Sequence, residues 1–227
     1  MSAAVLYHFP FDPGSRSARL ALGEAKIAHE EIVVRPWEPD CPIAGMNPSG
    51  MPPVLQTTEA GKPLTLCEAP AILGWIEDKQ RAPLLLSTDH AERAEARRLT
   101  GWFDRRFTDE VNAVLLHERL EKPLLRLGPP EARALRDGRA ALKDHLAMLE
   151  PLAASREWLA GRRLSQADLV AAAHVSVLDY FGEISWRSYP SLKLWYMKLK
   201  SRPCFRSLLA DKFQGLAAAP HYADLDF

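Results

Sequence analysis

The chain has 227 residues, of which 47% are hydrophobic and 26% charged, values typical of a globular protein that buries a core. Lys and Arg together number 29, as do Asp and Glu, so no charge excess indicates a nucleic-acid or anionic-membrane partner. The first residues do not resemble a signal peptide, and the most apolar stretch, 169–178, is about half the length of a transmembrane helix. We therefore expect neither nucleic-acid binding nor membrane insertion.

The cysteines and histidines indicate neither a disulfide framework nor a metal site. Cys41, Cys67 and Cys204 lie far apart with no CxxC spacing, and an odd, sparse set of cysteines fits a reducing cytoplasm. The seven histidines form no HxxxH or HExxH pattern. We therefore expect a cytoplasmic protein that binds no metal.

Residues 1–80 alternate short β-rich runs with helical ones. Residues 5–9 and 31–34 are β-rich and flank a helix whose apolar residues recur at the i, i+3, i+4, i+7 spacing. Asp12 followed by Pro13 is typical of a helix start, because Asp caps free backbone N–H groups and proline suits the first helical position. A strand, a helix and a strand of this length predict a parallel βαβ unit.

A hairpin and a helix complete this first domain. Residues 53–57 and 64–67 predict two antiparallel strands joined by a turn-like stretch at 59–62. A helix at 71–78 follows, and the proline-containing, polar stretch at 81–90 is the predicted linker.

The rest of the chain has helical periodicity. Residues 91–215 carry long apolar stripes opposite charged faces. The most apolar helix begins after Ser165, and Asp168 completes a start that resembles a capping box. Residues 216–227 form a C-terminal tail. The predicted fold class is therefore an α+β domain followed by an all-α domain.

Five segments, in order, resemble the glutathione-transferase family and cover nearly the whole chain. They are similar to the family's first helix, its NPxGxVPxL segment, its ES-x-AI turn and two later helices, at residues 15–22, 47–55, 66–72, 164–171 and 189–203. The resemblance implies the glutathione-transferase fold, in which a thioredoxin-like domain precedes an all-helical one. It also implies a homodimer and a cis bond between Pro52 and Pro53.

The resemblance implies a glutathione site in the first domain, and this sequence departs from it. Asp12 falls where several classes of the family place a catalytic Ser or Cys, but an ionised carboxylate donates no hydrogen bond and repels a thiolate. We interpret Asp12 as a helix N-cap. Ser15 is the candidate thiolate donor if the protein is an enzyme, and a plain first-turn serine otherwise.

Two further departures predict weak glutathione binding. Pro52, before Pro53, has no N–H, so one of two backbone hydrogen bonds to glutathione cannot form. Ala69 replaces the serine that holds the γ-glutamyl carboxylate, while Glu68 is retained. Each loss costs about 1–3 kcal/mol, or roughly tenfold to a hundredfold in affinity. We therefore expect a remnant glutathione site with no cofactor and no catalysis.

Three short segments indicate a narrower resemblance. Residues 9–10 and 102–104, and above all the Tyr-x-x-Leu-Asp-Phe ending at 222–227, resemble the glutathione-transferase-like cell-division proteins of alphaproteobacteria. Those proteins bind the tubulin-like polymer protein FtsZ. The resemblance implies a non-catalytic dimeric adaptor at the division site, with FtsZ as a partner and a link to the septal wall-synthesis machinery.

The tail and one tryptophan are the candidate partner-binding residues. A flexible terminus rarely carries large apolar side chains, so the tail either packs on its own domain or docks on a partner. Its candidate residues are Tyr222, Asp224, Leu225, Asp226 and Phe227. The residues alone favour packing back, whereas the resemblance favours docking. Trp37, between two prolines, is an interface anchor, a lid on the remnant cleft or a dimer contact.

Three functions remain open at this point, and the adaptor that binds FtsZ is favoured. The alternative is an active glutathione transferase that conjugates hydrophobic electrophiles, with Ser15 as the thiolate donor and glutathione as its cosubstrate. A third hypothesis is a stress-response or other adaptor with an unknown protein partner. The fold alone does not separate them, because function depends on the site.

Overall fold

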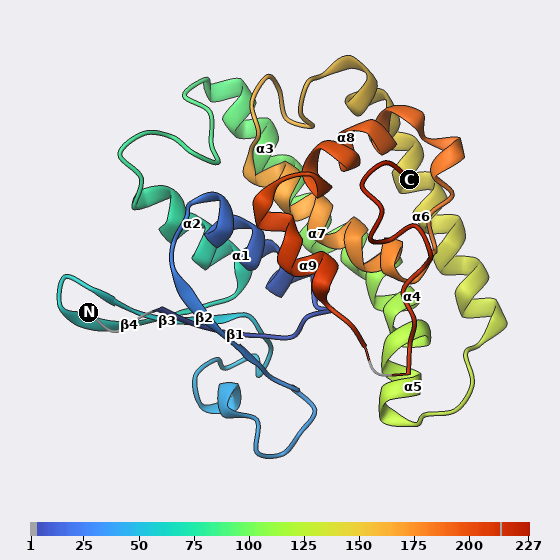
Figure 1. Ribbon diagram of the computed structural model, residues 1–227, viewed down its shortest axis with the longest axis horizontal. Helices are drawn as coiled ribbons and strands as arrows, with labels where there is room; N and C mark the ends of the chain where they lie inside the picture. The colour runs from blue at the N-terminus through green and yellow to red at the C-terminus, as the bar shows by residue number, and fades with distance from the viewer. Residues whose placement is uncertain (1–3, 214) are drawn as a thin grey trace.

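The computed structural model describes residues 4–213 and 215–227. A four-stranded sheet and two helices form the first part of the chain, and the remaining helices pack together beside it (Figure 1). The predicted fold class, an α+β domain followed by an all-α domain, is confirmed.

The sheet combines a parallel βαβ unit with an antiparallel hairpin, in the order β2-β1-β3-β4. Its strands are β1 (Ala4–His8), β2 (His29–Val33), β3 (Val54–Glu59) and β4 (Lys62–Cys67). β1 pairs with β2 in parallel, and β3 pairs with both β1 and β4 antiparallel. The βαβ unit and the hairpin predicted from the sequence are therefore both confirmed.

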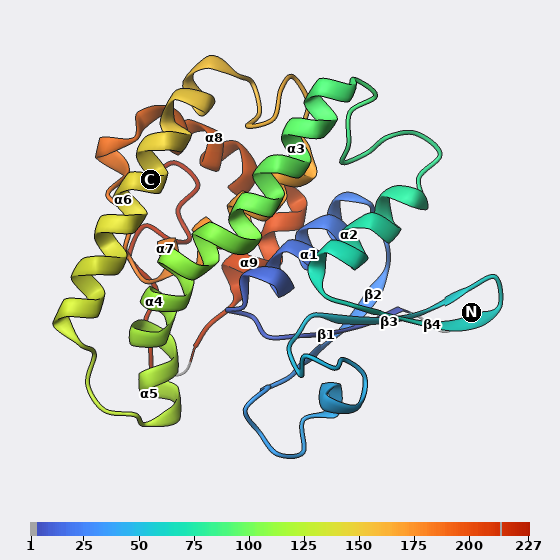
Figure 2. The same cartoon turned by 180° about the vertical axis from the view of Figure 1, so that it is seen from behind.

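Two helices, α1 (Pro13–Glu24) and α2 (Ala69–Asp78), cover one face of the sheet, and the loop with η1 (Pro42–Gly45) lies on the other (Figure 2). The predicted cap is confirmed, because the Asp12 side chain accepts a hydrogen bond from the first turn of α1. Residues 15–22 of α1 are all buried, since the helix lies between the sheet and the helical domain.

The helical domain opens with one long rod in which α-helical and π-helical turns alternate. Its segments are α3 (His90–Trp102), η2 (Phe103–Asn112), α4 (Ala113–Leu116), η3 (His117–Glu121) and α5 (Lys122–Leu125). The π-helical segments are η2 and η3, and π-helical turns frequently occur at functional sites. The long helix α6 (Ala132–Ser155) packs against η2 and α4.

The helix α7 (Gln166–Tyr180) runs through the centre of the domain and packs against α1. Its predicted start is confirmed, because the Ser165 backbone N–H donates to Asp168 Oδ2 at 2.9 Å. Burial raises the pKa of Asp168. The chain then continues through η4 (Trp186–Ser188), α8 (Pro190–Lys200), η5 (Pro203–Phe205) and α9 (Arg206–Ala210). In the described residues no helix has the length and apolarity needed to cross a membrane.

Candidate functional site: an interdomain cleft and a docked tail

A cleft of about 560 Å³ lies between the first domain and the helical domain. The first domain contributes the start of α1, the loop before β3 and the start of α2, and the helical domain contributes η2, α4, η3 and α7. The structure brings together five of the six residues predicted for the remnant glutathione site: Asp12, Pro52, Pro53, Glu68 and Ala69.

Asp12 serves as the N-cap of α1. Its Oδ2 accepts a hydrogen bond from the Ser15 backbone N–H at 2.6 Å. Burial is the largest influence on this carboxyl group and raises its pKa, against the opposing effect of the hydrogen bonds from Ser15. An ionised carboxylate accepts hydrogen bonds and donates none, so Asp12 stabilises no thiolate and offers the cleft an acceptor.

Ser15, the sixth predicted residue, does not line the cleft. Its side chain is fully buried, and its Oγ accepts a hydrogen bond from the Phe9 backbone N–H at 3.1 Å. This contact holds the turn between β1 and α1. The Ser15 hydroxyl therefore lies inside the first domain, away from any ligand in the cleft.

Two positions that differ from the family pattern, Pro52 and Ala69, lie beside the retained Pro53 and Glu68. The bond between Pro52 and Pro53 is cis, as predicted, and Pro52 offers no N–H to the cleft. Glu68 adopts a φ of 72°, a conformation that is uncommon outside glycine, and its backbone N–H donates to the Pro53 carbonyl at 3.0 Å. Its carboxylate accepts from Asn47 Nδ2 at 2.9 Å and Ser49 Oγ at 2.7 Å. Ala69 is buried and has no polar side-chain atom.

The helical domain adds polar residues that the sequence analysis did not identify. Asp104, Asn112 and Glu121 line the cleft from the long rod, and His174 lines it from α7. His174 Nδ1 lies 2.9 Å from Asn112 Oδ1, and its Nε2 lies 3.9 Å from Asp104 Oδ1. The π-helical segment η2 carries Asp104 and Asn112. Asp104 lies in the 102–104 segment of the narrower resemblance, which assigned it no role in the cleft, and no sequence motif marks Asn112.

Trp37 lines an apolar hollow of about 330 Å³ that continues from the cleft. Its ring packs edge-on against Phe9, with the ring centroids 5.1 Å apart. Met51 and Leu125 also line the hollow and are exposed. This position of Trp37 is compatible with a lid on the remnant cleft. The ring is half-buried, so part of it remains accessible to a partner.

The C-terminal tail packs on its own domain through Tyr222. The Tyr222 side chain is 1% exposed, and its hydroxyl accepts from Arg16 Nη1 at 3.1 Å and donates to the Leu208 carbonyl at 3.0 Å. The Tyr222 side chain is not accessible to a partner in this conformation, and its predicted role as a partner contact stays a prediction. A large aromatic ring gains more by filling the space beside Tyr180 than by remaining in water.

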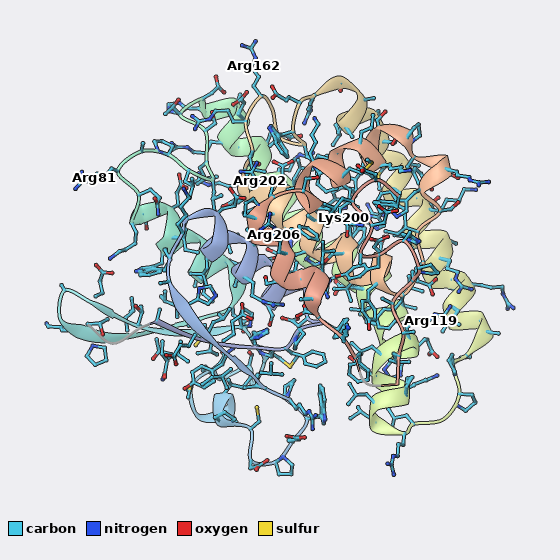
Figure 3. All side chains as sticks on the ribbon, viewed as in Figure 1. Arg81, Arg119, Arg162, Lys200, Arg202 and Arg206 are labelled. Carbon is cyan, nitrogen blue, oxygen red and sulfur yellow. The ribbon has the colours of Figure 1, made fainter. Side chains whose placement is uncertain are left out.

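Lys200, at the end of α8, fixes the last residues of the tail. It is buried within the helical domain, whereas Arg162 projects from the molecule's edge (Figure 3). Its Nζ donates to the Asp224 carbonyl at 2.6 Å and lies 4.1 Å from the centroid of the Phe227 ring. Phe227 is half-buried as a result. Of the five tail residues predicted to contact a partner, Asp224, Leu225 and Asp226 are exposed.

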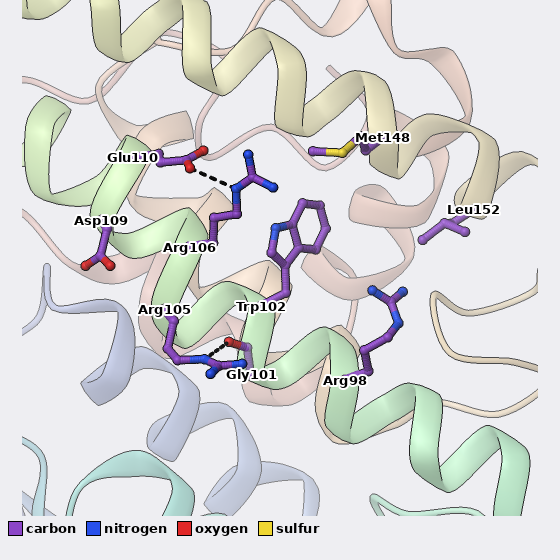
Figure 4. A pocket seen from close by; sticks show the side chains of 9 residues that line it. All are labelled: Arg98, Gly101, Trp102, Arg105, Arg106, Asp109, Glu110, Met148 and Leu152. Atoms are coloured by element: carbon purple, nitrogen blue, oxygen red, sulfur yellow. Dashed lines mark hydrogen bonds and ion pairs between the residues drawn. The ribbon is translucent and has the colours of Figure 1, made fainter.

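A second hollow, of about 670 Å³, lies between the rod and α6. Figure 4 shows three arginines, Arg98, Arg105 and Arg106, arranged around the Trp102 ring. Met148 and Leu152 of α6 form its opposite wall. Arg106 is paired with Glu110 at 2.8 Å, so the surface mixes charged and apolar groups.

The cysteines form no disulfide within the described residues, and the Cys204 thiol is held in its neutral form. All three are free, and Cys204 Sγ donates a hydrogen bond to Glu24 Oε1 at 3.0 Å. Burial, followed by this contact with Glu24, raises the Cys204 pKa, so the thiolate is disfavoured. Within residues 4–213 and 215–227, no group of three or more His, Cys, Asp or Glu side chains is arranged to hold a metal ion.

Comparisons with known proteins agree on one family. The family model described as glutathione S-transferase, N-terminal domain, matches residues 13–79, and the model of the C-terminal domain matches residues 116–203. FtsZ-localized protein A from Caulobacter vibrioides is 57% identical over 98% of this chain and 97% of its own. Glutathione S-transferase GstB from Escherichia coli is 28% identical over 84% of this chain and 89% of its own.

Solved structures of similar fold also include glutathione S-transferases and an FtsZ-localized relative. The structure titled FzlA from C. crescentus has a TM-score of 0.95 at 56% identity, covering 100% of both chains. A glutathione S-transferase from Rhodospirillum rubrum has a TM-score of 0.93 at 41% identity, covering 99% of this chain and 100% of that one. Both structures share the complete two-domain arrangement described above.

Proposed function

The chain belongs to the glutathione S-transferase family, and from that premise we propose that it is a non-catalytic adaptor that binds FtsZ filaments and links them to septal wall synthesis at the division site. The observation that carries this proposal is the whole-length similarity, 57% identity, to a relative whose name places it with FtsZ. Similarity of this extent covers both domains and the tail.

The chemistry of the cleft supports an adaptor rather than an enzyme. Pro52 offers no N–H, Ala69 offers no hydroxyl and Asp12 offers a carboxylate where a thiolate needs a donor. Ser15 is fully buried and already bonded to Phe9. Each departure removes a contact that glutathione would need, so binding energy is lost at several points at once.

The exposed end of the tail and the half-buried Trp37 are the candidate FtsZ contacts. Leu225 is 40% exposed between the carboxylates of Asp224 and Asp226, on a tail that Lys200 and Tyr222 hold in place. Trp37 lies elsewhere, over the hollow beside the cleft. A tail fixed in one conformation loses little entropy on binding, which favours it as a docking element.

A homodimer is part of the proposal. The groove between the rod and α6 exposes Trp102, Met148 and Leu152 among charged side chains, and pairing with the first domain of a second copy would bury these apolar groups (Figure 4). A dimer would present two tails to a filament, and two linked sites raise avidity without new contacts. Light scattering at micromolar concentration measures the oligomeric state directly.

Co-sedimentation with GTP-assembled FtsZ tests the adaptor proposal. We expect the protein to pellet with filaments at micromolar concentration and moderate salt, and a Leu225→Asp, Asp226→Lys variant to pellet less. Leu194→Asp is the matched control, because Leu194 is an exposed leucine on α8 outside the tail. Protein that stays in the supernatant with intact filaments contradicts the proposal and favours an adaptor with another partner.

The apolar hollow beside the cleft is the observation that favours the alternative, an active glutathione transferase acting on hydrophobic electrophiles. Calorimetric titration with reduced glutathione separates the two. Absence of heat at millimolar glutathione supports the adaptor. Micromolar binding, together with conjugation that Ser15→Ala abolishes, supports the enzyme, with glutathione as cosubstrate.

A further inference from the structure

The cleft is rich in hydrogen-bond acceptors and poor in cations. Four of the residues that line it are acidic: Asp12, Glu68, Asp104 and Glu121. No Lys or Arg lines the cleft within the described part of the chain. Glutathione carries two carboxylates and one ammonium group, so four carboxylates around it oppose its binding.

The existing partners of these carboxylates leave room for a cation. Glu121 pairs with His117 at 2.7 Å, and Glu68 accepts only neutral donors, from Asn47 and Ser49. Asp104 is 3.9 Å from His174 and has no closer ionic partner in residues 4–213 and 215–227. Burial has the largest effect on the pKa of Asp12 and raises it, whereas the hydrogen bonds from Ser15 and the nearby His174 act in the opposite direction.

Within the described residues, Asn112 adds a hydrogen-bond donor without a partner to this wall of acceptors. It is 2% exposed and lines the same cleft, and its Nδ2 has no hydrogen-bond partner among the described residues. Its Oδ1 is bonded to His174. A buried donor without a partner is costly, and a ligand carbonyl oxygen in the cleft would satisfy it.

We propose that the cleft binds an arginine-bearing peptide segment of a partner protein, with the guanidinium on the carboxylates of Asp12 and Asp104 and a peptide carbonyl on Asn112. Guanidinium offers five N–H donors and no acceptor, which suits a wall of carboxylates. A peptide adds the carbonyl that a simple amine lacks. The site is independent of whether FtsZ is the partner.

The neighbouring hollow extends the site to the residues beside the arginine. Asp12, Pro13, Met51, Leu116 and Glu121 line both the cleft and the hollow. Beyond them the walls of the hollow are apolar, with Trp37 and Leu124. A side chain next to the arginine is therefore expected to be aliphatic. Leucine flanking an arginine matches this order of acidic and apolar walls.

Calorimetric titration of the full-length chain with acetyl-Leu-Arg-Leu-amide tests the proposal. The matched peptide carries citrulline in place of arginine, which keeps the shape but removes the charge. We expect the arginine peptide to bind at least about tenfold more tightly and to weaken as salt is raised. Equal affinity for the two peptides overturns the proposal, as does tighter binding of glutathione than of the arginine peptide.

A pair of variants on η2 locates the binding. Asp104→Asn removes a carboxylate from the cleft, whereas Asp109→Asn removes one from the groove beside Trp102. We expect Asp104→Asn to weaken the arginine peptide about fivefold or more and Asp109→Asn to leave it unchanged. Equal effects of the two variants contradict the assignment. Spermidine that binds as tightly as the peptide overturns the peptide assignment in favour of a simple polyamine.

The two experiments distinguish a failure of the peptide-binding proposal from a failure of the adaptor proposal. Co-sedimentation with FtsZ is read on filaments, and the peptide titration contains no FtsZ. If the protein pellets with filaments but does not bind the arginine peptide, the adaptor proposal stands and only the proposed peptide site is contradicted.

Discussion

The Arg16 guanidinium and the Tyr222 hydroxyl lie 3.1 Å apart, although 206 residues separate them in the chain. Arg16 belongs to α1 in the first domain and is fully buried, and its Nη1 also donates to Ser176 Oγ on α7 at 2.8 Å. One side chain therefore connects the first domain, the central helix of the second and the C-terminal tail. The tail is part of the interdomain core, which makes it a structural element as well as a candidate contact.

Truncating Tyr222 is expected to destabilise the whole protein. Tyr222→Ala removes a buried aromatic ring and leaves Arg16 with one partner fewer, so we expect a loss of roughly 3–5 kcal/mol in the free energy of unfolding. Urea denaturation measures this loss. Leu225→Ala, on the exposed part of the same tail, is the control and is expected to change stability by less than about 0.5 kcal/mol. Equal effects would show that the tail does not pack as described.

Lys200 is expected to control whether the last residues stay docked. Lys200→Met keeps the length of the side chain but removes the donor to the Asp224 carbonyl and the charge over the Phe227 ring. We expect faster amide hydrogen exchange and faster carboxypeptidase cleavage after residue 222, with the sheet unaffected. Lys198→Met is the control, because Lys198 is exposed on the same helix and contacts Glu157 instead. Unchanged exchange in the tail would contradict this role.

Acid is expected to destabilise the protein through His8. Burial, and then the nearby Arg19, lower the pKa of His8 from 6.5 to about 4. A depressed pKa in the folded state means that stability is fully present above pH 6.5 and is lost as pH falls toward 4. The loss amounts to about 3 kcal/mol. Melting temperatures between pH 8 and 4 measure it, and His8→Gln should flatten the curve in this window, whereas the exposed His90→Gln should not.

Local patterns in the sequence predict most of the first domain. Asp12 and Pro13 mark the start of α1, and the capping box at Ser165 and Asp168 marks the start of α7, because capping depends on residues three positions apart. The cis bond at Pro53 follows from the family resemblance. These features require no knowledge of distant contacts.

Features that depend on distant residues were missed. Asp104 and Asn112 line the cleft from the π-helical segment η2, and no periodicity in the sequence distinguishes that segment from an ordinary helix. A lysine at the end of a helix is expected to be exposed, but Lys200 is buried because the tail folds over it. The aromatic residues of the tail indicated that it packs on its own domain. The family resemblance favoured docking on a partner instead.

Ser15→Ala is expected to reduce stability whether or not the protein has catalytic activity. The substitution leaves the part-buried Phe9 N–H without its acceptor, which costs about 1–3 kcal/mol. Thermal unfolding measures the loss. Ser49→Ala is the control, because Ser49 is exposed and its bond to the Glu68 carboxylate is open to solvent. A Ser15→Ala variant of unchanged stability would contradict the structural role of this hydroxyl.

Restoring the two lost glutathione contacts tests whether their absence explains the loss of binding. Pro52→Val returns a backbone N–H beside Pro53, and Ala69→Ser returns a hydroxyl at the start of α2. Each contact is worth about tenfold to a hundredfold, so the double variant is expected to bind glutathione more tightly than the parent chain by at least about tenfold. Calorimetry measures the affinities, with Ala71→Ser as a control that adds a hydroxyl on α2 at a position that does not line the cleft. Because the acidic wall of Asp12, Asp104 and Glu121 remains, adding Asp104→Asn should raise the affinity again. A double variant that gains no affinity would instead make that wall the dominant obstacle.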